Sequence, residues 1–280
     1  MASASPTVRR RELGARLRAL RTGAGMTVDD AAARMEVSPA KISRIETGAR
    51  GVSVADLRFL CELYEVSVEE RDRLLNLARE SKRRSWWQQY GLPESIATYI
   101  GLEDAAVSIR QYETSIVPPL LQTEEYAHAL IAGADFYAVP EQEQLVRARM
   151  TRQKILAAEP APELWAVIDE AALHRVVGGT EVMRAQLQAL AQRSRAQNVT
   201  LQVIPFRAGA HPGLNSSFVI LQLEEVQDVV YVEGLIGNFY LQSPADLVRY
   251  RRTFDELRAV ALGPQDTRKL IDAVAGRLGA

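Results

Sequence analysis

A group of small, polar and basic side chains near the amino terminus has the spacing to bind DNA. Its members are Ser38, Ala40, Lys41, Ser43 and Arg44. If this stretch is a helix, Ile42 and Ile45 share its buried face and the group lies on or beside the opposite face. Hydroxyl, ammonium and guanidinium groups at the first turns of a helix reach base edges and phosphates in the major groove. The pattern therefore predicts contacts to double-stranded DNA.

The residues before this group predict a helix and a turn that would hold it in place. Thr27 is a favourable N-cap, and Asp30 occupies the acidic position of a capping box three residues later. Glu36 and Val37 then form a turn. Because a second helix follows so short a turn, the two make a helix-turn-helix.

The second helix has its own start and stop signals. Ser38 is its N-cap, and Pro39 takes the first helical position, where its missing N–H costs nothing. Gly48 ends the helix. Thr27 and Pro39, at the starts of the two helices, join the group above as predicted DNA-binding residues.

Three further helices are predicted around this motif. Residues 10 to 25 carry leucines on one helical stripe, and residues 53 to 66 and 67 to 84 give capped fourth and fifth helices. Cys61 lies in the stripe of the fourth helix, where core packing explains it better than redox chemistry. The amino-terminal region is therefore predicted to be an all-α helix-turn-helix bundle.

The charge of the chain differs between its two parts. The 280 residues have a net charge of −1, but residues 1 to 84 hold 17 Lys and Arg against 12 Asp and Glu, and the remainder holds 17 against 23. A positive amino-terminal domain supplies attraction to phosphates, whereas the acidic remainder is not expected on DNA. Arg9, Arg10 and Arg11 are interpreted as a solvated tail, or as a tail that reaches along the DNA backbone or into a minor groove.

Composition excludes several classes of protein. No apolar run approaches 18 residues and the first residues contain no hydrophobic segment, so neither membrane association nor secretion is expected. A single cysteine excludes an internal disulfide framework and a multi-cysteine metal site. We expect a cytoplasmic protein without a metal or cofactor.

A domain boundary is predicted where the sequence turns from basic to aromatic and then to Gly and Pro, in residues 81 to 93. We predict a DNA-binding domain over residues 1 to 84 and a second domain over residues 85 to 280. The aromatic residues in this linker are too many for a free tether, so we expect them to dock onto one of the domains. They are Trp86, Trp87 and Tyr90.

The second domain is predicted to be α+β with a mixed sheet. Helical patterns cover six regions, and β-rich runs cover six. The helices are predicted over residues 94–104, 122–133, 140–158, 181–197, 244–262 and 265–278. The strands are predicted over residues 108–118, 163–169, 199–206, 217–223, 229–234 and 239–242. One strand, the helix over 181–197 and the next strand suggest a right-handed βαβ unit extended by antiparallel strands.

Three roles for this domain can be drawn from its residues. A metal or acid–base site could use acidic and histidine side chains, namely Asp169, Glu170, His174, His211 and Glu233. No catalytic motif accompanies them, so we predict that the protein is not an enzyme. The alternatives are a ligand or peptide pocket at the carboxyl ends of the strands, and dimerisation or partner docking through the apolar face of residues 182–190.

The amino-terminal pattern resembles the Xre family of phage-repressor and Cro-like DNA-binding domains over residues 9 to 80. Ala32 matches the family's small residue at the helix contact, and the residues from Ser38 to Glu46 match its recognition helix. Val28 departs from the usual Gln and Glu36 from the usual turn Gly, so one usual contact is missing and the turn carries some strain. The resemblance also suggests that Glu46 pairs with Arg18.

The rest of the chain resembles the carboxy-terminal domain of a family of actinobacterial antitoxin-like transcriptional regulators. The matching motifs lie at residues 86–90, 112–127, 147–156, 168–179, 199–206 and 211–213. The resemblance implies a DNA-binding regulator whose second domain binds an effector or a small partner protein encoded nearby. It leaves open an antitoxin that mainly neutralises its partner and binds DNA for autoregulation.

A homodimer is expected because one helix-turn-helix reads only about one half-site of DNA. The apolar residues of the amino-terminal bundle are needed for its own core. We therefore predict that the dimer interface lies mainly in residues 85 to 280.

Overall fold

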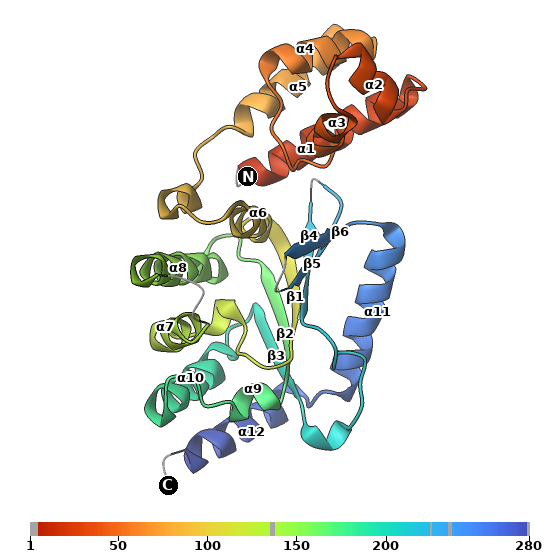
Figure 1. Ribbon diagram of the computed structural model, residues 1–280. Coiled ribbons are helices and arrows are strands. Elements are labelled where there is room, and N and C mark those ends of the chain that lie inside the picture. The colour runs from red at the N-terminus through yellow and green to blue at the C-terminus, as the bar shows by residue number, and fades with distance from the viewer. Residues whose placement is uncertain (1–4, 135–137, 225, 235–236, 279–280) are drawn as a thin grey trace. The chain divides into compact units, whose positions relative to one another are not determined.

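The computed structural model describes residues 5–134, 138–224, 226–234 and 237–278. The chain divides into two compact units, Met1–Gln88 and Gln89–Ala280 (Figure 1). The first contains helices only, and the second combines helices with a six-stranded mixed sheet. The predicted fold class is therefore confirmed. Among the described residues, no helix has the length and apolarity needed to cross a membrane.

The first unit is a bundle of short helices. They are α1 (Pro6–Gly23), α2 (Val28–Arg34), α3 (Pro39–Glu46), α4 (Val54–Leu63) and α5 (Val68–Glu80). Each begins at a Ser or Thr whose side-chain oxygen accepts a hydrogen bond from a backbone N–H of the first turn. Such caps satisfy N–H groups that have no partner inside the helix, so the bounds follow from local sequence.

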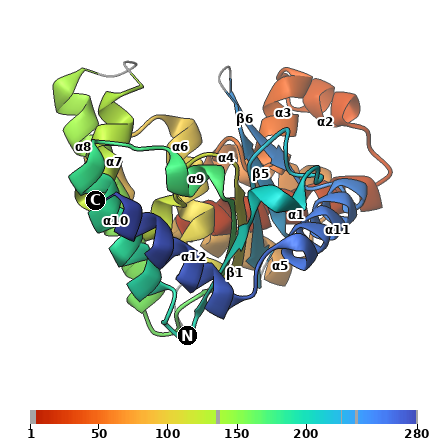
Figure 2. The same cartoon turned by 90° about the horizontal axis from the view of Figure 1, so that it is seen from below.

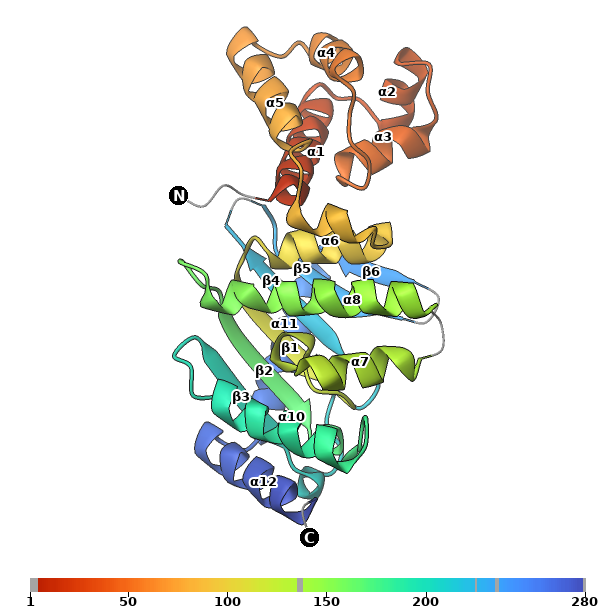
Figure 3. The ribbon, with the colours of Figure 1, turned by 90° about the vertical axis from the view of Figure 1, so that its left-hand side faces the viewer.

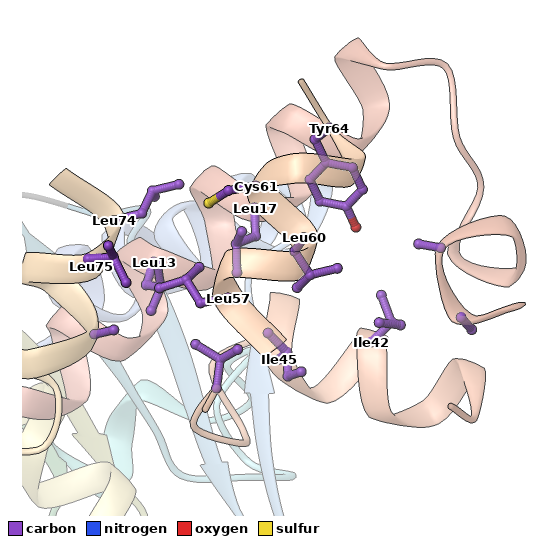
Figure 4. Close-up of a cluster of buried hydrophobic side chains, with 14 residues drawn as sticks. Leu13, Leu17, Ile42, Ile45, Leu57, Leu60, Cys61, Tyr64, Leu74 and Leu75 are labelled. Carbon is purple, nitrogen blue, oxygen red and sulfur yellow. The ribbon is translucent and has the colours of Figure 1, made fainter. Parts of the chain in front are cut away.

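The core of the first unit joins all of its helices. Leu13 and Leu17 of α1 meet Ile42 and Ile45 of α3 and the apolar side chains of α4 and α5 in one cluster (Figure 4). Gly14 permits the close approach of α1 to α3, because a Cβ atom there would lie 2.5 Å from the carbonyl oxygen of Ile45. Cys61 is 2% exposed, which confirms its predicted role in packing.

The three arginines near the amino terminus belong to α1, so the prediction of a charged tail is wrong. Ser5 caps the helix and Pro6 occupies its first turn. Arg9 forms ion pairs with Glu12 at 2.9 Å and with Glu80 at 3.0 Å. Ser5 and Pro6 start the helix before the three arginines, so these arginines are helical although their charge had suggested a tail.

The sheet of the second unit has the strand order β3-β2-β1-β4-β5-β6. Its strands are β1 (Ala106–Glu113), β2 (Glu163–Asp169), β3 (Val199–Ile204), β4 (Phe218–Leu223), β5 (Val229–Glu233) and β6 (Asn238–Leu241). β2 is parallel to β1 and β3, whereas β4, β5 and β6 continue the sheet antiparallel to their neighbours. The predicted strand over 108–118 ends at Glu113, because the N–H of Thr114 donates to the Ser217 hydroxyl and leaves the ladder.

Helices cover both faces of the sheet, but unequally. One face carries a row of helices that lie side by side (Figure 3): α6 (Glu94–Glu103), α8 (Val139–Arg152), α7 (Glu124–Ala132), α10 (Thr180–Arg193) and α12 (Pro264–Arg277). The long helix α11 (Pro244–Val260) covers the opposite face (Figure 2). Shorter turns complete the unit: α9 (Ala171–His174), η2 (Pro119–Leu121), η3 (Gln153–Ala157) and η4 (Phe206–Ala208).

The apolar face of residues 182–190 is not available for dimerisation, so that interpretation is wrong. Met183, Leu187 and Leu190 are completely buried. They lie on α10, which packs against α12 and α7 inside the unit. The helical period identified a buried face correctly, but the neighbours that bury it come from distant parts of the chain.

The linker aromatics lie in a short 3-10 helix, η1 (Trp86–Tyr90). The Tyr90 hydroxyl is 3.0 Å from the Thr151 hydroxyl of α8, within the second unit. Docking onto a domain is thereby confirmed for Tyr90.

Candidate nucleic-acid interface

The helix-turn-helix is formed by α2, a short turn and α3. Thr27 and Asp30 make a reciprocal capping box: the Thr27 Oγ1 accepts from the Asp30 N–H at 3.1 Å, and the Thr27 N–H donates to the Asp30 carboxylate at 2.9 Å. The hydrogen bonds from Thr27 lower the pKa of Asp30. Glu36 has a φ of 53°, so the left-handed turn inferred from the sequence is confirmed.

Helix α3 begins and ends as its sequence predicts. The Ser38 hydroxyl accepts from the Lys41 N–H at 3.3 Å, and Pro39 is the first helical residue. Gly48 follows the helix with a φ of +69°, and a Cβ atom there would lie 2.8 Å from the Cα atom of Arg11. Glycine therefore allows both the turn and the close approach of α1.

A buried ion pair fixes α3 against α1. Arg21 donates to both Glu46 oxygens, from Nε at 2.6 Å and from Nη2 at 3.0 Å, and the two side chains are 7% and 6% exposed. The bond to Glu46 raises the pKa of Arg21. Arg18, the suggested partner, is exposed. That expectation is wrong because Arg21 follows Leu13 and Leu17 at four-residue steps on the buried stripe, whereas Arg18 is one position off it.

The exposed face of α3 presents Arg44 and Ser43. The Arg44 guanidinium makes a hydrogen bond to the carbonyl of Ala40 at 3.3 Å and no ion pair with any residue that the structure describes. Ser38, Pro39 and Ala40 are exposed at the start of the same helix. The structure thus brings most of the predicted DNA-binding residues onto one exposed surface.

Two predicted residues have other partners. The Lys41 ammonium lies 3.0 Å from a carboxylate oxygen of Asp56 in α4, and the Lys41 side chain is only 20% exposed. The Thr27 hydroxyl lies 2.6 Å from the Asp30 carboxylate, so its proton has a partner within the capping box. Arg44 is consequently the better-placed cation of α3.

Sequence reasoning missed Arg50. This exposed residue follows α3, and its N–H donates to the Arg44 carbonyl at 2.9 Å, which places the two backbones together. Within the described ranges, Arg50 has no ion-pair partner. A basic residue between Gly48 and Gly51, directly after the recognition helix, was the signal available in the sequence.

The acidic and histidine residues of the second unit form separate pairs. His211 lies 3.3 Å from the Asp169 carboxylate, and His174 lies 3.3 Å from Glu170. The His211 side chain is 2% exposed. Glu233 instead lies near Glu113, whose pKa it helps to raise. Among the described residues, the five form only these two pairs, and Glu233 belongs to neither.

The second unit buries charges beneath α8. Arg152 donates to both oxygens of Glu103 at 2.8 Å, and the Tyr99 hydroxyl donates to the same carboxylate at 2.8 Å. Burial raises the pKa of Glu113 to about 7, although Gln111 donates to it at 2.8 Å. These groups bind each other inside the fold.

Comparison with known proteins agrees with this division. Residues 12–74 match a helix-turn-helix domain, which indicates DNA binding. Residues 96–273 match a domain of unknown function, DUF5753. No curated protein matches the chain.

Proposed function

The chain belongs to the DUF5753 family and carries a helix-turn-helix domain, and on this premise we propose that it is a sequence-specific transcriptional regulator of the Xre type. In this proposal α3 enters the major groove of double-stranded DNA. Arg44 reads a base edge, Ser38 and Ser43 hydrogen-bond to bases or phosphates, and Arg50 contacts the backbone.

The exposed face of α3 is the observation that carries the proposal. Ile42, Ile45 and Glu46 anchor the helix on its buried side, with exposures of 1%, 3% and 8%. Arg44 on the exposed side has no ion-pair partner among the described residues. A rigid helix that presents an unpaired guanidinium is suited to a bidentate contact with guanine.

We further propose that the regulator acts as a homodimer. One α3 covers a single half-site, so selectivity requires two copies related by a two-fold axis and about one DNA turn apart. The second unit supplies most of the interface in this proposal. Its exposed apolar side chains include Phe239, Val248 and Val260, which are 59%, 65% and 45% exposed.

The second unit is proposed to bind rather than to catalyse. Its role in the cytoplasm is to bind an effector or, as in antitoxin-like regulators, a small partner protein encoded nearby. The Asp169–His211 pair supports binding over catalysis, because the His211 side chain is 2% exposed and so lacks access to a substrate.

Selection of DNA from a random pool by the full-length protein tests the proposal. We expect a pseudo-palindromic site whose half-sites lie one helical turn apart, and sedimentation of a dimer at micromolar concentration. Affinity should fall steeply with salt, because binding releases counterions from phosphates. Enrichment of no sequence would refute sequence-specific regulation, and a monomer on a single half-site would refute the dimer.

A further inference from the structure

The face of the sheet covered by α11 contains a cavity that the DNA-binding role does not use. It lies between β1, β4 and α11 and measures about 280 Å³. Its walls are formed by Ser108, Arg110, Ile220, Gln222, Asp228 and Arg251. The volume is at the lower end of the range for small-molecule sites, so the cavity suits a compact ligand.

Strand alternation explains why polar side chains reach this cavity. Ser108, Arg110 and Tyr112 occupy alternate positions of β1 and so share one face. Tyr112 is fully buried in the cluster that packs against α11, whereas Arg110 and Ser108 are half-buried. In the neighbouring strand, Gln222 pairs with Ser108 and Ile220 pairs with Arg110. The apolar core therefore ends at Arg110 and a polar wall begins there.

Arg110 has no charged or hydrogen-bonding partner among the residues that the structure describes. Its guanidinium makes no hydrogen bond and no ion pair with any residue in the described part of the chain. Glu163 is the register partner of Ser108 on the other side of β1, but it neither pairs with Arg110 nor lines the cavity. A half-buried guanidinium without an anion is costly to desolvate, so the site favours an anionic ligand.

The other charges in the cavity do not neutralise Arg110. Arg251 forms an ion pair with Asp228. The second oxygen of Asp228 accepts from the backbone N–H of Leu223 at 3.1 Å. Both oxygens of the Asp228 carboxylate thus have partners already, and neither forms an ion pair with Arg110. Two arginines and one aspartate leave the cavity with a net positive charge.

We infer that this cavity binds a small metabolite bearing a carboxylate or a phosphate. The Arg110 guanidinium holds two oxygens of the anionic group, because its planar fork matches carboxylate and phosphate geometry. Ser108 and Gln222 hydrogen-bond to the polar group beside it, and Ile220 contacts the carbon skeleton. As an effector site, the cavity rests on the proposed regulatory function, but ligand binding by itself does not.

Calorimetric titration of the full-length protein tests the inference, with succinate and glycerol 3-phosphate as the probes. We expect saturable binding of at least one of them, and the preferred probe identifies the carboxylate or the phosphate as the anionic group. Arg110→Gln should weaken that binding by at least about tenfold, because a hydrogen-bonded charge pair is lost. Arg110→Lys should also weaken it, since an ammonium lacks the planar fork. Ser108→Ala should weaken the binding of the probe by about fivefold.

Two variants separate this cavity from other basic surfaces. Arg252→Gln removes a charge from α11 at a side chain that is 81% exposed and lies outside the cavity. Arg44→Ala alters the DNA-binding helix. Both should bind the probe as the parent does.

Failure of both probes to bind, or equal binding by the parent, Arg110→Gln and Ser108→Ala, would overturn the inference. DNA affinity measured on the same preparations is an independent readout. If the parent protein binds no operator, the proposed regulatory function is refuted, but the inferred ligand site is not.

Discussion

The two units of this chain differ in what surrounds a buried arginine–glutamate pair. Both bury a bidentate arginine–glutamate pair, Arg21–Glu46 in the first and Arg152–Glu103 in the second. Around the first pair, Arg44 remains exposed and unpaired within the described ranges. Around the second, Glu113 is buried and Arg149 is half-buried, and desolvation lowers the pKa of Arg149 to about 10. In both units the paired arginines hold helices together, whereas arginines without an ion-pair partner among the described residues, such as Arg44 and Arg110, are available to a ligand.

Each buried pair joins helices that are distant in sequence. Arg21–Glu46 links α1 to the recognition helix, so it sets the direction in which Arg44 points. Arg152–Glu103 links α8 to α6, and the guanidinium also lies 5.1 Å from the centre of the Tyr99 ring. A carboxylate with three donors in the second unit should be harder to replace than one with two in the first.

The largest effect should come from breaking the pair in the second unit. Glu103→Gln should lower the free energy of unfolding by about 3–5 kcal/mol, because Arg152 is left buried without a counter-charge. Urea unfolding of the full-length protein measures the loss. Glu256→Gln is the control, since its partner Arg252 is exposed and such pairs are worth about 1 kcal/mol or less. Equal losses for the two variants would contradict the assigned role of burial.

The second-largest loss of stability should come from breaking the Arg21–Glu46 pair in the first unit. Glu46→Ala should cost about 3 kcal/mol, because it leaves Arg21 uncompensated beside the core. It should also weaken operator binding, since α3 loses its anchor. Arg18→Ala is the matched control and should change the free energy of unfolding by less than about 0.5 kcal/mol. A larger loss from Arg18→Ala than from Glu46→Ala would restore the pairing that the structure rejects.

The raised pKa of Glu113 should make the stability of the folded protein depend on pH. Burial raises its pKa to about 7 in the folded protein, against about 4.5 for an unperturbed glutamate, so the folded state binds the proton more tightly than the unfolded state. The resulting stability is fully present below about pH 4.5 and is lost as the pH rises through 7, by about 3 kcal/mol. Glu113→Gln should remove this pH-dependent loss of stability. Thermal unfolding of the parent and the variant at a series of pH values measures the difference. An unchanged pH profile would show that Glu113 titrates normally.

The smallest effect is expected for Lys41. Its ion pair with Asp56 is partly exposed, so Lys41→Ala should cost about 0.5–1 kcal/mol of stability. Operator affinity should change less than in Arg44→Ala, because the ammonium is turned towards α4. Fluorescence anisotropy on the selected operator compares the two variants. A greater loss of affinity in Lys41→Ala than in Arg44→Ala would show that Lys41 contributes more than Arg44 to DNA binding.

The first unit was largely predictable because its signals are local. The Thr27 capping box, the Ser38–Pro39 start and the left-handed Glu36 each depend on a few consecutive residues. The Arg18 prediction failed, and the ion pair of Lys41 with Asp56 was missed, because partner choice depends on helix rotation and on side chains in other helices. Arg21 competes for Glu46, and Asp56 competes for Lys41.

In the second unit the elements were predictable but their neighbours were not. Hydrophobic patterns located the six strands and the helical crossover. They could not show that α12 covers α10, or that β4 follows β1 in the sheet, because such contacts join residues far apart in the chain. The position of Arg110 beside Arg251 depends on that pairing, and no local pattern indicates it.

The most direct test of the central claim is the affinity of Arg44→Ala for the selected operator and for operators altered at each base pair. We predict a loss of about 1–3 kcal/mol in binding free energy that is concentrated at one base pair, and an unchanged affinity for Arg18→Ala. Uniform weakening at every position would reassign Arg44 to a phosphate. Binding equal to that of the parent on every operator would contradict the claim that the exposed face of α3 reads DNA.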